Sequence, residues 1–216
     1  PDFLSFEGRI AYHGALNSLA QVLIKITVPG IPDIYQGTEL WTLSLVDPDN
    51  RRPVDFQKRI VMLEELRRGE TEKRSCLLKD MVAEWKDGRI KLYLTDKALD
   101  FRREHAPVFL RGEYLPLATT GLRQSNVCAF ARCLDGFWCV TVAPRWTTQL
   151  VSEDLLPSTR SIWADTALQL AQGAPDKWRN VLTGEELTVS ISPEGNRTLA
   201  LRKLLDRFPV ALLGSI

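Results

Sequence analysis

The sequence predicts an α+β protein with two regions, residues 1–106 and residues 107–216. In the first region, apolar residues recur at the three- and four-residue spacing of helices that bury one face. In the second region, short segments of alternating or β-branched residues are separated by turn signals, which is typical of an antiparallel β domain. A stretch rich in Pro and Gly with little periodicity, residues 28–55, interrupts the helices. We therefore expect a few helices around one long loop, followed by a β-sandwich.

The first helix is predicted over residues 6–27. Its buried face would consist of Tyr12, Leu16, Leu19, Ala20, Leu23 and Ile26. His13 lies in the same helix, and no second His, Cys or carboxylate keeps metal-ligand spacing with it. We interpret His13 as a packed or surface histidine, and we predict no metal site.

The stretch 28–55 is predicted to begin as a buried strand and to continue as a loop. Pro and Gly residues form its entry, and residues 31–36 carry strand-forming side chains. After Gly37 the segment becomes polar, and Pro48 and Pro53 would stiffen it. The apolar residues expected to anchor the loop are Trp41, Leu43, Leu45 and Val46.

The polar side chains of this stretch are candidates for substrate binding. They are Tyr35, Gln36, Glu39, Asp47, Asp49, Asn50, Arg51 and Arg52. Carboxylates accept hydrogen bonds from hydroxyls and guanidinium groups donate to them, so the set suits a ligand dense in hydroxyls. A phosphate ligand fits less well, because the acidic residues would repel it and no Gly-rich phosphate loop is present. The alternative is that these charges pair with one another and only hold the loop in shape.

Two more helices are predicted before residue 107. Apolar residues at helical spacing follow Asp55, which is placed to cap the first of these helices. The charged run 67–74 is interpreted as a solvated helix end or a surface linker, because acids and bases alternate in it. The next helix is expected over residues 88–105. His105 ends that helix, where positive charge is favourable, so it needs no catalytic role.

The second region is expected to fold from short strands. They are predicted at residues 109–117, 127–132, 137–143, 187–191, 199–201 and 209–213, with Asp135-Gly136 as a hairpin turn signal. Residues 144–184 form a less regular insert that contains Trp146, Trp163 and Trp178. These tryptophans suit either a platform on which sugar rings stack or the core of a small β-sandwich. We favour the core, because aromatic residues dominate such cores.

Composition excludes several classes of partner. The 28 Lys and Arg against 27 Asp and Glu give a net charge of +1, which indicates neither a nucleic-acid partner nor an acidic membrane surface. No apolar run reaches the roughly 18 residues of a membrane span. The four cysteines include no CxxC pair, which argues against a zinc site. We favour reduced thiols in a cytoplasmic protein over disulfides.

The run PGIPDIYQGTELWTLSLVDPDNRRPVDF, residues 29–56, closely resembles the corresponding stretch of maltooligosyltrehalose synthases, members of the α-amylase superfamily (glycoside hydrolase family 13). In the superfamily, PGIP followed by a Tyr, a Gly and a Glu marks the eighth barrel strand and the loop after it. The continuation SLVDPDNRRPVDF is more particular to the trehalose-forming branch. Further matches are NSLAQ (17–21), WKDGRIK (85–91), GEYLPL (112–117), AFAR (129–132) and FPVALL (208–213), so that the resemblance covers nearly the whole chain.

The resemblance implies that residues 1–106 are the C-terminal end of a (β/α)8 catalytic barrel and that residues 107–216 are a C-terminal β domain. The barrel part would hold the seventh helix, the eighth strand at 31–36, the substrate loop and the closing helices. A complete barrel needs about 250 residues. We therefore expect this chain of 216 residues to be a C-terminal fragment of a larger enzyme.

The activity that the resemblance implies for the parent enzyme is an intramolecular glucosyl transfer of the isomerase class. It converts the reducing-end α-1,4 linkage of a maltooligosaccharide into an α,α-1,1 linkage, giving maltooligosyltrehalose, and it needs no cofactor. No motif here matches the family's catalytic carboxylates, so we expect no catalytic residue in this chain and no activity from it alone. Glu39 is expected to support the loop, and Arg52 and Asp49 are the first candidates to hold the released glucose.

The expected partners are the maltooligosaccharide substrate, the remainder of the barrel and further copies of the fragment, which would associate through exposed apolar surface or a free sheet edge. Two alternatives remain for the function. One is another α-glucan-active enzyme of the superfamily, such as a glucanotransferase or an amylase. The other is a non-catalytic glycan-binding or scaffolding module, which predicts that the β domain itself binds maltooligosaccharides.

Overall fold

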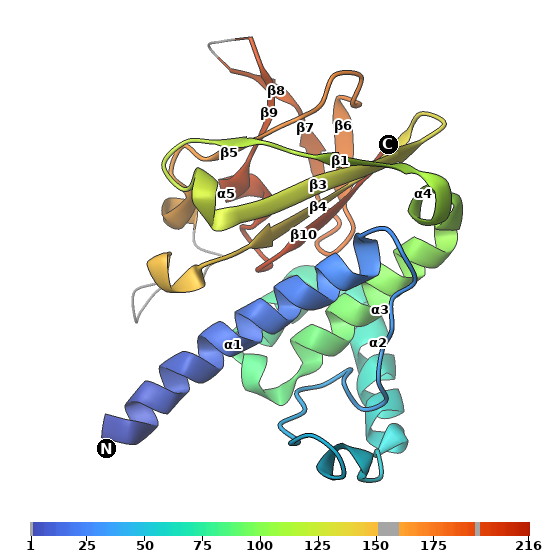
Figure 1. The fold of residues 1–216 in the computed structure, drawn as a ribbon, viewed down its shortest axis with the longest axis vertical. Helices are drawn as coiled ribbons and strands as arrows, with labels where there is room; N and C mark the ends of the chain where they lie inside the picture. The colour runs from blue at the N-terminus through green and yellow to red at the C-terminus, as the bar shows by residue number, and fades with distance from the viewer. Residues whose placement is uncertain (1, 151–159, 193–194) are drawn as a thin grey trace.

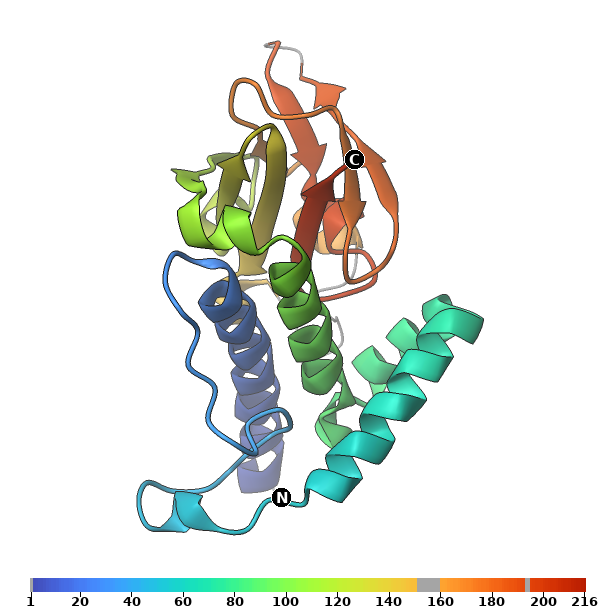
Figure 2. The same cartoon turned by 90° about the vertical axis from the view of Figure 1, so that its right-hand side faces the viewer.

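The computed structural model describes residues 2–150, 160–192 and 195–216. Three long helices lie below a β domain that is built from two antiparallel sheets (Figures 1 and 2). The helices are α1 (Asp2–Thr27), α2 (Phe56–Ala83) and α3 (Arg89–Glu104). Helices α1 and α2 each pack on α3, and α1 also contacts strand β4 (Phe137–Pro144). The predicted α+β organisation is therefore confirmed.

Helix α1 ends where the sequence dictates. Pro29 disfavours helical backbone in the residue before it, and the Thr27 hydroxyl donates to the Leu23 carbonyl at 2.7 Å in the last turn. Leu19, Leu23 and Ile26 are buried, so this part of the apolar face lies where the periodicity places it.

Helix α2 is longer than the sequence indicated. Asp55 caps it as predicted, because its carboxylate accepts from the Lys58 amide at 2.9 Å. The charged run 67–74 is neither a helix end nor a linker. It lies inside α2, which kinks where Lys73 leaves the helical conformation (φ −151°, ψ 57°). Glu70, just before the kink, pairs with Arg74 and with Lys97 of α3, so the run fastens two helices together.

Several short helices connect the larger elements. They are α4 (Ala106–Arg111) and α5 (Leu201–Leu204), with the 3₁₀ turns η1 (Asp49–Arg51), η2 (Trp85–Asp87), η3 (Gln124–Asn126), η4 (Thr147–Gln149) and η5 (Arg160–Trp163). The strand predicted over 109–117 is therefore wrong in its first half. Pro107 suits the first turn of a helix, and Val108 and Phe109 are buried on α4 instead.

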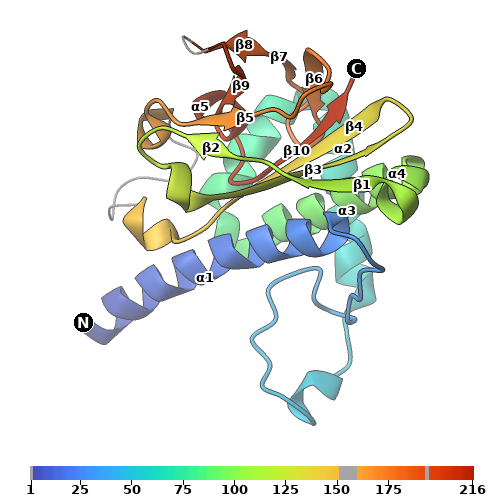
Figure 3. The same ribbon diagram turned by 45° about the horizontal axis from the view of Figure 1, so that its top comes forward.

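The β domain contains a six-stranded sheet of order β1-β3-β4-β10-β6-β7 and a four-stranded sheet of order β2-β5-β9-β8. The remaining strands are β1 (Glu113–Pro116), β2 (Thr119–Thr120), β3 (Val127–Leu134), β5 (Ala167–Gln169), β6 (Lys177–Asn180), β7 (Glu186–Thr188), β8 (Ser190–Ile191), β9 (Arg197–Ala200) and β10 (Ala211–Ser215). The hairpin predicted at Asp135-Gly136 joins β3 to β4, and both turn residues have positive φ, as two-residue hairpins require. Figure 3 shows the two sheets above α1.

Two hydrophobic cores hold the molecule together. One lies where the helices meet the larger sheet and includes Leu23, Leu94 and Phe208. The other lies in the β domain and includes Trp163 and Trp178, both 0% exposed. The core interpretation is thus confirmed for two of the three tryptophans in the insert. Trp146 is the exception, since it is 54% exposed. All four cysteines are free.

Two arginines fasten the C-terminal end of α1. Arg102 of α3 donates to the carbonyls of Ile26 and Gly30, both at 2.6 Å. Arg132 of β3 is 2% exposed. Among the described residues its guanidinium donates only to backbone carbonyls, which include Thr27 at 3.5 Å and Gly112 at 2.7 Å. The last carbonyls of a helix have no partner inside the helix, so these guanidinium groups complete α1 and join it to the β domain.

The stretch between α1 and α2 differs most from expectation. Residues 31–36 form no strand, and Ile31 is 89% exposed. A strand needs a hydrogen-bonded neighbour, and none of the strand pairings among the described residues involves this segment. Leu43, Leu45 and Val46 do not anchor the loop, because they are 77–96% exposed. The loop instead extends away from the helices (Figure 3).

Candidate functional site

Of the residues expected to anchor the loop, only Trp41 does so. Its indole N–H donates to the Trp85 carbonyl at 2.6 Å, and the two indole rings meet edge to face. Leu40, the preceding residue, is buried against the same helical core. The chain is therefore fixed at positions 40 and 41, and the exposed segment that follows is free of core contacts until α2 begins.

One cavity of about 330 Å³ lies where the chain leaves α1 and crosses towards Trp41. Its walls come from α1, from the segment 33–38 and from α3. The lining residues are Ser18, Gln21, Val22, Lys25, Asp33, Ile34, Tyr35, Thr38, Lys91 and Thr95. Hydroxyl, amide, ammonium and carboxylate groups therefore face one space, and this mixture can both donate hydrogen bonds to a ligand and accept them.

Lys91 is the most constrained charge in this cavity. It is 8% exposed, and its ammonium donates to the Leu40 carbonyl at 3.3 Å and lies over the Trp41 ring. Burial lowers the pKa of Lys91, nearby Lys25 lowers it further, and Glu39 acts in the opposite direction. Lys91 also occupies the first turn of α3, where the helix dipole disfavours a cation. The cavity therefore holds a positive charge that the fold compensates only in part.

The charged residues of the loop mostly pair with one another. Arg59 of α2 donates to Glu39 at 2.9 Å and to the carbonyl of Gly37 at 2.8 Å, so Glu39 holds the start of the loop against α2. Asp47 pairs with Arg51, four residues further along the chain.

Arg52 and Asp49 form a second ion pair, in which one side chain is largely buried and the other is exposed. The Asp49 carboxylate also accepts from the Leu45 amide at 2.8 Å, and its side chain is 23% exposed. The Arg52 side chain is 77% exposed, so much of its guanidinium faces solvent. The Asn50 side-chain oxygen is buried and has no hydrogen-bond partner among the described residues. Asp49 is thus fixed by the loop, while Arg52 presents donors outward.

The candidate substrate-binding residues do not converge on one cavity. Only Tyr35 is among the residues that line the 330 Å³ space, whereas the residues from Asp47 to Arg52 surround η1. Gln36 is exposed. A larger concavity of about 850 Å³ lies on the β domain, but the carboxylates at its edge are engaged, Glu185 with Arg207 and Glu186 with Arg179.

Sequence reasoning missed Lys91 as a cavity residue, together with Lys25 and Gln21. Gln21 and Lys25 lie on α1 outside the apolar face predicted for it. Lys91 follows Ile90, which is buried on α3. Thr95 lies four residues after Lys91, and its hydroxyl donates to the Lys91 carbonyl at 2.8 Å. The sequence does contain one signal for Lys91, because a lysine next to the apolar face of a helix can bury its aliphatic part and direct its ammonium group into a cavity.

His13 has a structural partner, as interpreted. Its Nδ1 shares a hydrogen bond of 2.9 Å with the Thr147 hydroxyl and so connects α1 to η4. Among the residues that the structure describes, no group of three or more His, Cys, Asp and Glu side chains is placed to hold a metal ion. None of the described helices is both long and apolar enough to cross a membrane.

Comparison with known proteins gives a consistent picture. No protein-family model matches the sequence. A Mycobacterium tuberculosis protein described as a maltooligosyl trehalose synthase is 37% identical over 172 residues, which is 80% of this chain and 18% of that protein. This chain thus spans about a fifth of the length of the curated relatives it matches.

Solved structures agree with the sequence comparison. Maltooligosyltrehalose synthase from Arthrobacter ramosus superposes with a TM-score of 0.70 at 29% identity, covering 94% of this chain and 22% of that one. Another maltooligosyl trehalose synthase structure gives 0.66 at 32% identity, covering 99% of this chain and 24% of that one. An Anoxybacillus α-amylase gives 0.54 at 18% identity over 93% of this chain and 32% of its own, which shows a shared fold only.

Proposed function

We propose, from the premise that this chain is similar to the C-terminal part of maltooligosyltrehalose synthases, that it completes the catalytic barrel of such an enzyme. In this proposal α1 is the seventh barrel helix, residues 31–36 become the eighth strand, and α2 and α3 close the barrel before a β domain that starts at residue 107. The observation that carries the proposal is the 37% identity over 80% of the chain.

The exposed apolar surface supports an incomplete barrel. Phe3, Leu4, Phe6 and Ile10 on the first half of α1 are 53–74% exposed, and Ile31 in the unpaired segment is 89% exposed. Apolar side chains in such numbers on one helix usually meet a partner. The other strands and helices of a barrel would cover α1 and would supply the neighbours that a strand at 31–36 requires.

The proposed activity of the complete enzyme is the conversion of a reducing-end α-1,4 linkage of a maltooligosaccharide into an α,α-1,1 linkage. Retention in such a transfer requires two carboxyl groups about 5–5.5 Å apart, one as nucleophile and one as acid. We assign that pair to the part of the enzyme before this chain, and we infer that the 216-residue chain alone is inactive. No cofactor is needed for this exchange of glycosidic bonds.

This chain would supply one wall of the pocket for the released glucose. Arg52, with its outward-facing guanidinium, can donate to two hydroxyls at once, and Asp49 holds Arg52 in place through their ion pair. Tyr35 and the ammonium groups beside it would face the same pocket if residues 31–36 join the barrel. Holding glucose by several polar contacts while it turns keeps it from leaving before the new bond forms.

The test uses the chain extended at its N-terminus to the length of its relatives, with product formation followed by NMR. We expect Arg52→Gln to lower kcat/KM for trehalose formation about 100-fold, because a lost positioning contact has effects of that size. Lys58→Gln, on the exposed start of α2, serves as the control and should change it little. Equal activity of the two variants would contradict the assignment of Arg52.

The alternative of another α-glucan-active enzyme makes a different prediction for the same assay. An amylase would release maltose or glucose from maltopentaose, and a glucanotransferase would give longer α-1,4 chains. Structures of such enzymes share the fold at 18% identity or less, so they do not favour either activity over trehalose formation.

A further inference from the structure

Trp146 is placed unlike the other tryptophans of the insert. Trp163 and Trp178 are completely buried, whereas 54% of Trp146 is exposed on η4, at the edge of the β domain. Trp146 is therefore not a core residue, and the proposed function gives it no role. Loop 36–52 and η4 lie on opposite sides of α1 in Figures 1 and 3, so Trp146 is separate from the proposed substrate loop.

The backbone at Trp146 is one that a tryptophan rarely adopts. Its φ of 51° and ψ of 46° lie in the left-handed region, which favours glycine and is strained for a bulky side chain. Neighbouring hydrogen bonds hold this conformation, with the Gln149 amide donating to the Trp146 carbonyl at 3.0 Å and the Arg145 amide donating to Asn126 at 2.9 Å. The chain thus carries a large side chain at a position whose backbone conformation suits glycine. Backbone strain of this kind often occurs at functional sites.

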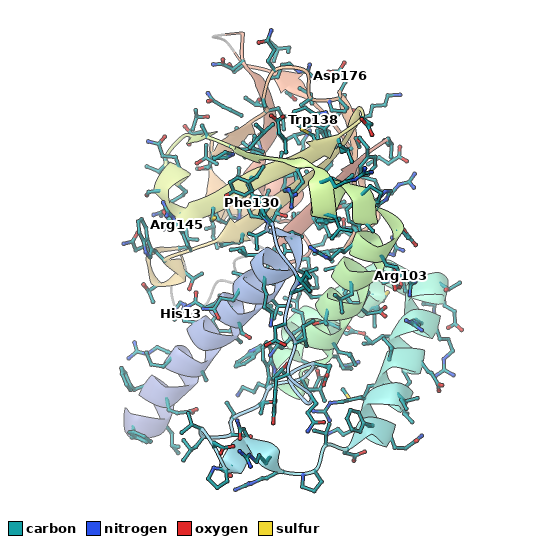
Figure 4. All side chains as sticks on the ribbon, turned by 45° about the vertical axis from the view of Figure 1, so that its right-hand side comes forward. His13, Arg103, Phe130, Trp138, Arg145 and Asp176 are labelled. Carbon is teal, nitrogen blue, oxygen red and sulfur yellow. The ribbon has the colours of Figure 1, made fainter. Side chains whose placement is uncertain are left out.

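Arg145 fixes the orientation of the exposed ring. Its guanidinium lies 4.3 Å from the centre of the Trp146 ring, and its Nε donates to the Ser125 carbonyl at 2.9 Å. With this cation stacked on the ring, 54% of Trp146 is still exposed to solvent. Figure 4 shows Arg145 at the lower edge of the β domain, on the same side of the molecule as His13. The His13–Thr147 hydrogen bond ties η4 to α1 and adds rigidity to the site.

We propose that Trp146 is a binding platform for one sugar ring of an α-1,4-glucan, separate from the loop 36–52. The apolar face of a pyranose suits the flat indole, and the exposed side chains of Arg145 and Gln149 beside it can donate to hydroxyls at the edge of the sugar. The choice of an α-glucan as ligand rests on the proposed function. The site would hold a long substrate chain at a distance from the proposed pocket wall.

The test measures binding of maltoheptaose to the 216-residue chain by isothermal titration calorimetry. The decisive variant is Trp146→Gly, because glycine adopts a φ of 51° without strain. We expect the wild type to bind saturably with a Kd of about 1 mM and the variant to bind about tenfold more weakly or worse, as the loss of one stacked ring implies. The Tm of the variant should stay the same or rise.

Tyr114→Ala is the matched control, since Tyr114 is an exposed aromatic on β1 and should not affect binding. Trp146→Phe should keep part of the affinity, because a smaller ring remains. The proposal is overturned if the folded wild type shows no saturable binding, if Trp146→Gly binds as tightly, or if that variant only lowers the Tm. A trehalose assay on the extended protein separates the two proposals, since binding without trehalose formation would contradict the proposed function alone.

Discussion

Arg59 of α2 contacts both ends of the loop. Its side chain is 17% exposed and donates to Glu39 and to the carbonyls of Gly37 and Asp55. One planar group therefore satisfies acceptors at both ends of the loop. Sequence reasoning found Glu39 but not its partner, because Arg59 lies 20 residues away on a different element.

We predict that Arg59→Met, which keeps the apolar stem but removes the guanidinium, lowers the free energy of unfolding by about 2 kcal/mol. Limited trypsinolysis should also cleave faster after Arg51, because the start of the loop is no longer held against α2, whereas the bond between Arg52 and Pro53 resists trypsin. Arg68→Met, on the exposed side of α2, is the control. If the loop of the Arg59 variant resists trypsin as well as the loop of the Arg68 variant does, Arg59 does not hold the loop against α2.

The two histidines make stability depend on pH. His105 stacks on Phe137 at 4.2 Å and touches Phe101, and burial lowers its pKa below the usual 6.5. Burial lowers the pKa of His13 in the same way. The unfolded chain therefore binds more protons than the folded chain once the pH falls below about 6.5, so stability is full above that pH and is lost as the pH falls towards the folded-state values.

We predict a lower Tm at pH 5.5 than at pH 7.5, with most of this decrease absent in the double variant His13→Asn, His105→Gln. These are the only histidines in the sequence, so the variant removes every imidazole. Calorimetric scans at both pH values test this. A wild-type Tm that is unchanged or higher at pH 5.5 would refute it.

At the scale of elements, the sequence predicted those with strong periodicity best. Helix α3 and the β3–β4 hairpin occur within a residue or two of the expected bounds, because each has its own signals for start, stop and turn. Other strands of the second half were predicted less well. The predicted strand 187–191 is divided into β7 and β8, which belong to different sheets. Strands β2, β5 and β6 were not predicted, and Leu201 begins α5 rather than extending β9. Local patterns identify such elements, but they do not show which neighbours each one meets.

The failures at this scale have a physical cause. Residues 31–36 have a strand sequence, yet a strand exists only with a hydrogen-bonded partner. Leu43, Leu45 and Val46 are apolar but face solvent, because the chain around η1 makes its contacts within the loop. Lys91 could not be assigned to a cavity from the sequence, because the other walls come from α1 and from residues 33–38.

Arg132 joins the C-terminal end of α1 to the β domain, so its removal should weaken this junction. In the part of the chain that the structure describes, Arg132 has only backbone carbonyls as acceptors, including Thr27 at the end of α1 and Gly112 after α4. We predict that Arg132→Met lowers the free energy of unfolding by about 3 kcal/mol, because buried carbonyls lose their donor. Arg111→Met, exposed on α4, should cost little. Urea denaturation measures both, and equal midpoints for the two variants would contradict this role.

At the scale of the whole molecule, the exposed apolar side chains of α1 determine how the chain behaves in solution. Phe6 and Ile10 are 53% and 54% exposed, and they add to an apolar surface of the kind that normally meets a partner. We predict that the chain self-associates in a concentration-dependent way. Phe6→Ser with Ile10→Ser should shift it towards monomer in light scattering without lowering the Tm. If the wild-type chain stays monomeric at high concentration, the exposed apolar face of α1 does not drive self-association.

We propose that this chain completes a trehalose-forming enzyme whose catalytic carboxylates lie in the part of the enzyme before it. The most direct measurement is the formation of maltooligosyltrehalose from maltopentaose by the 216-residue chain and by the same chain extended at its N-terminus to the length of its relatives. We predict product from the extended protein alone. Turnover by the 216-residue chain, or none by a folded extended protein, would contradict the claim.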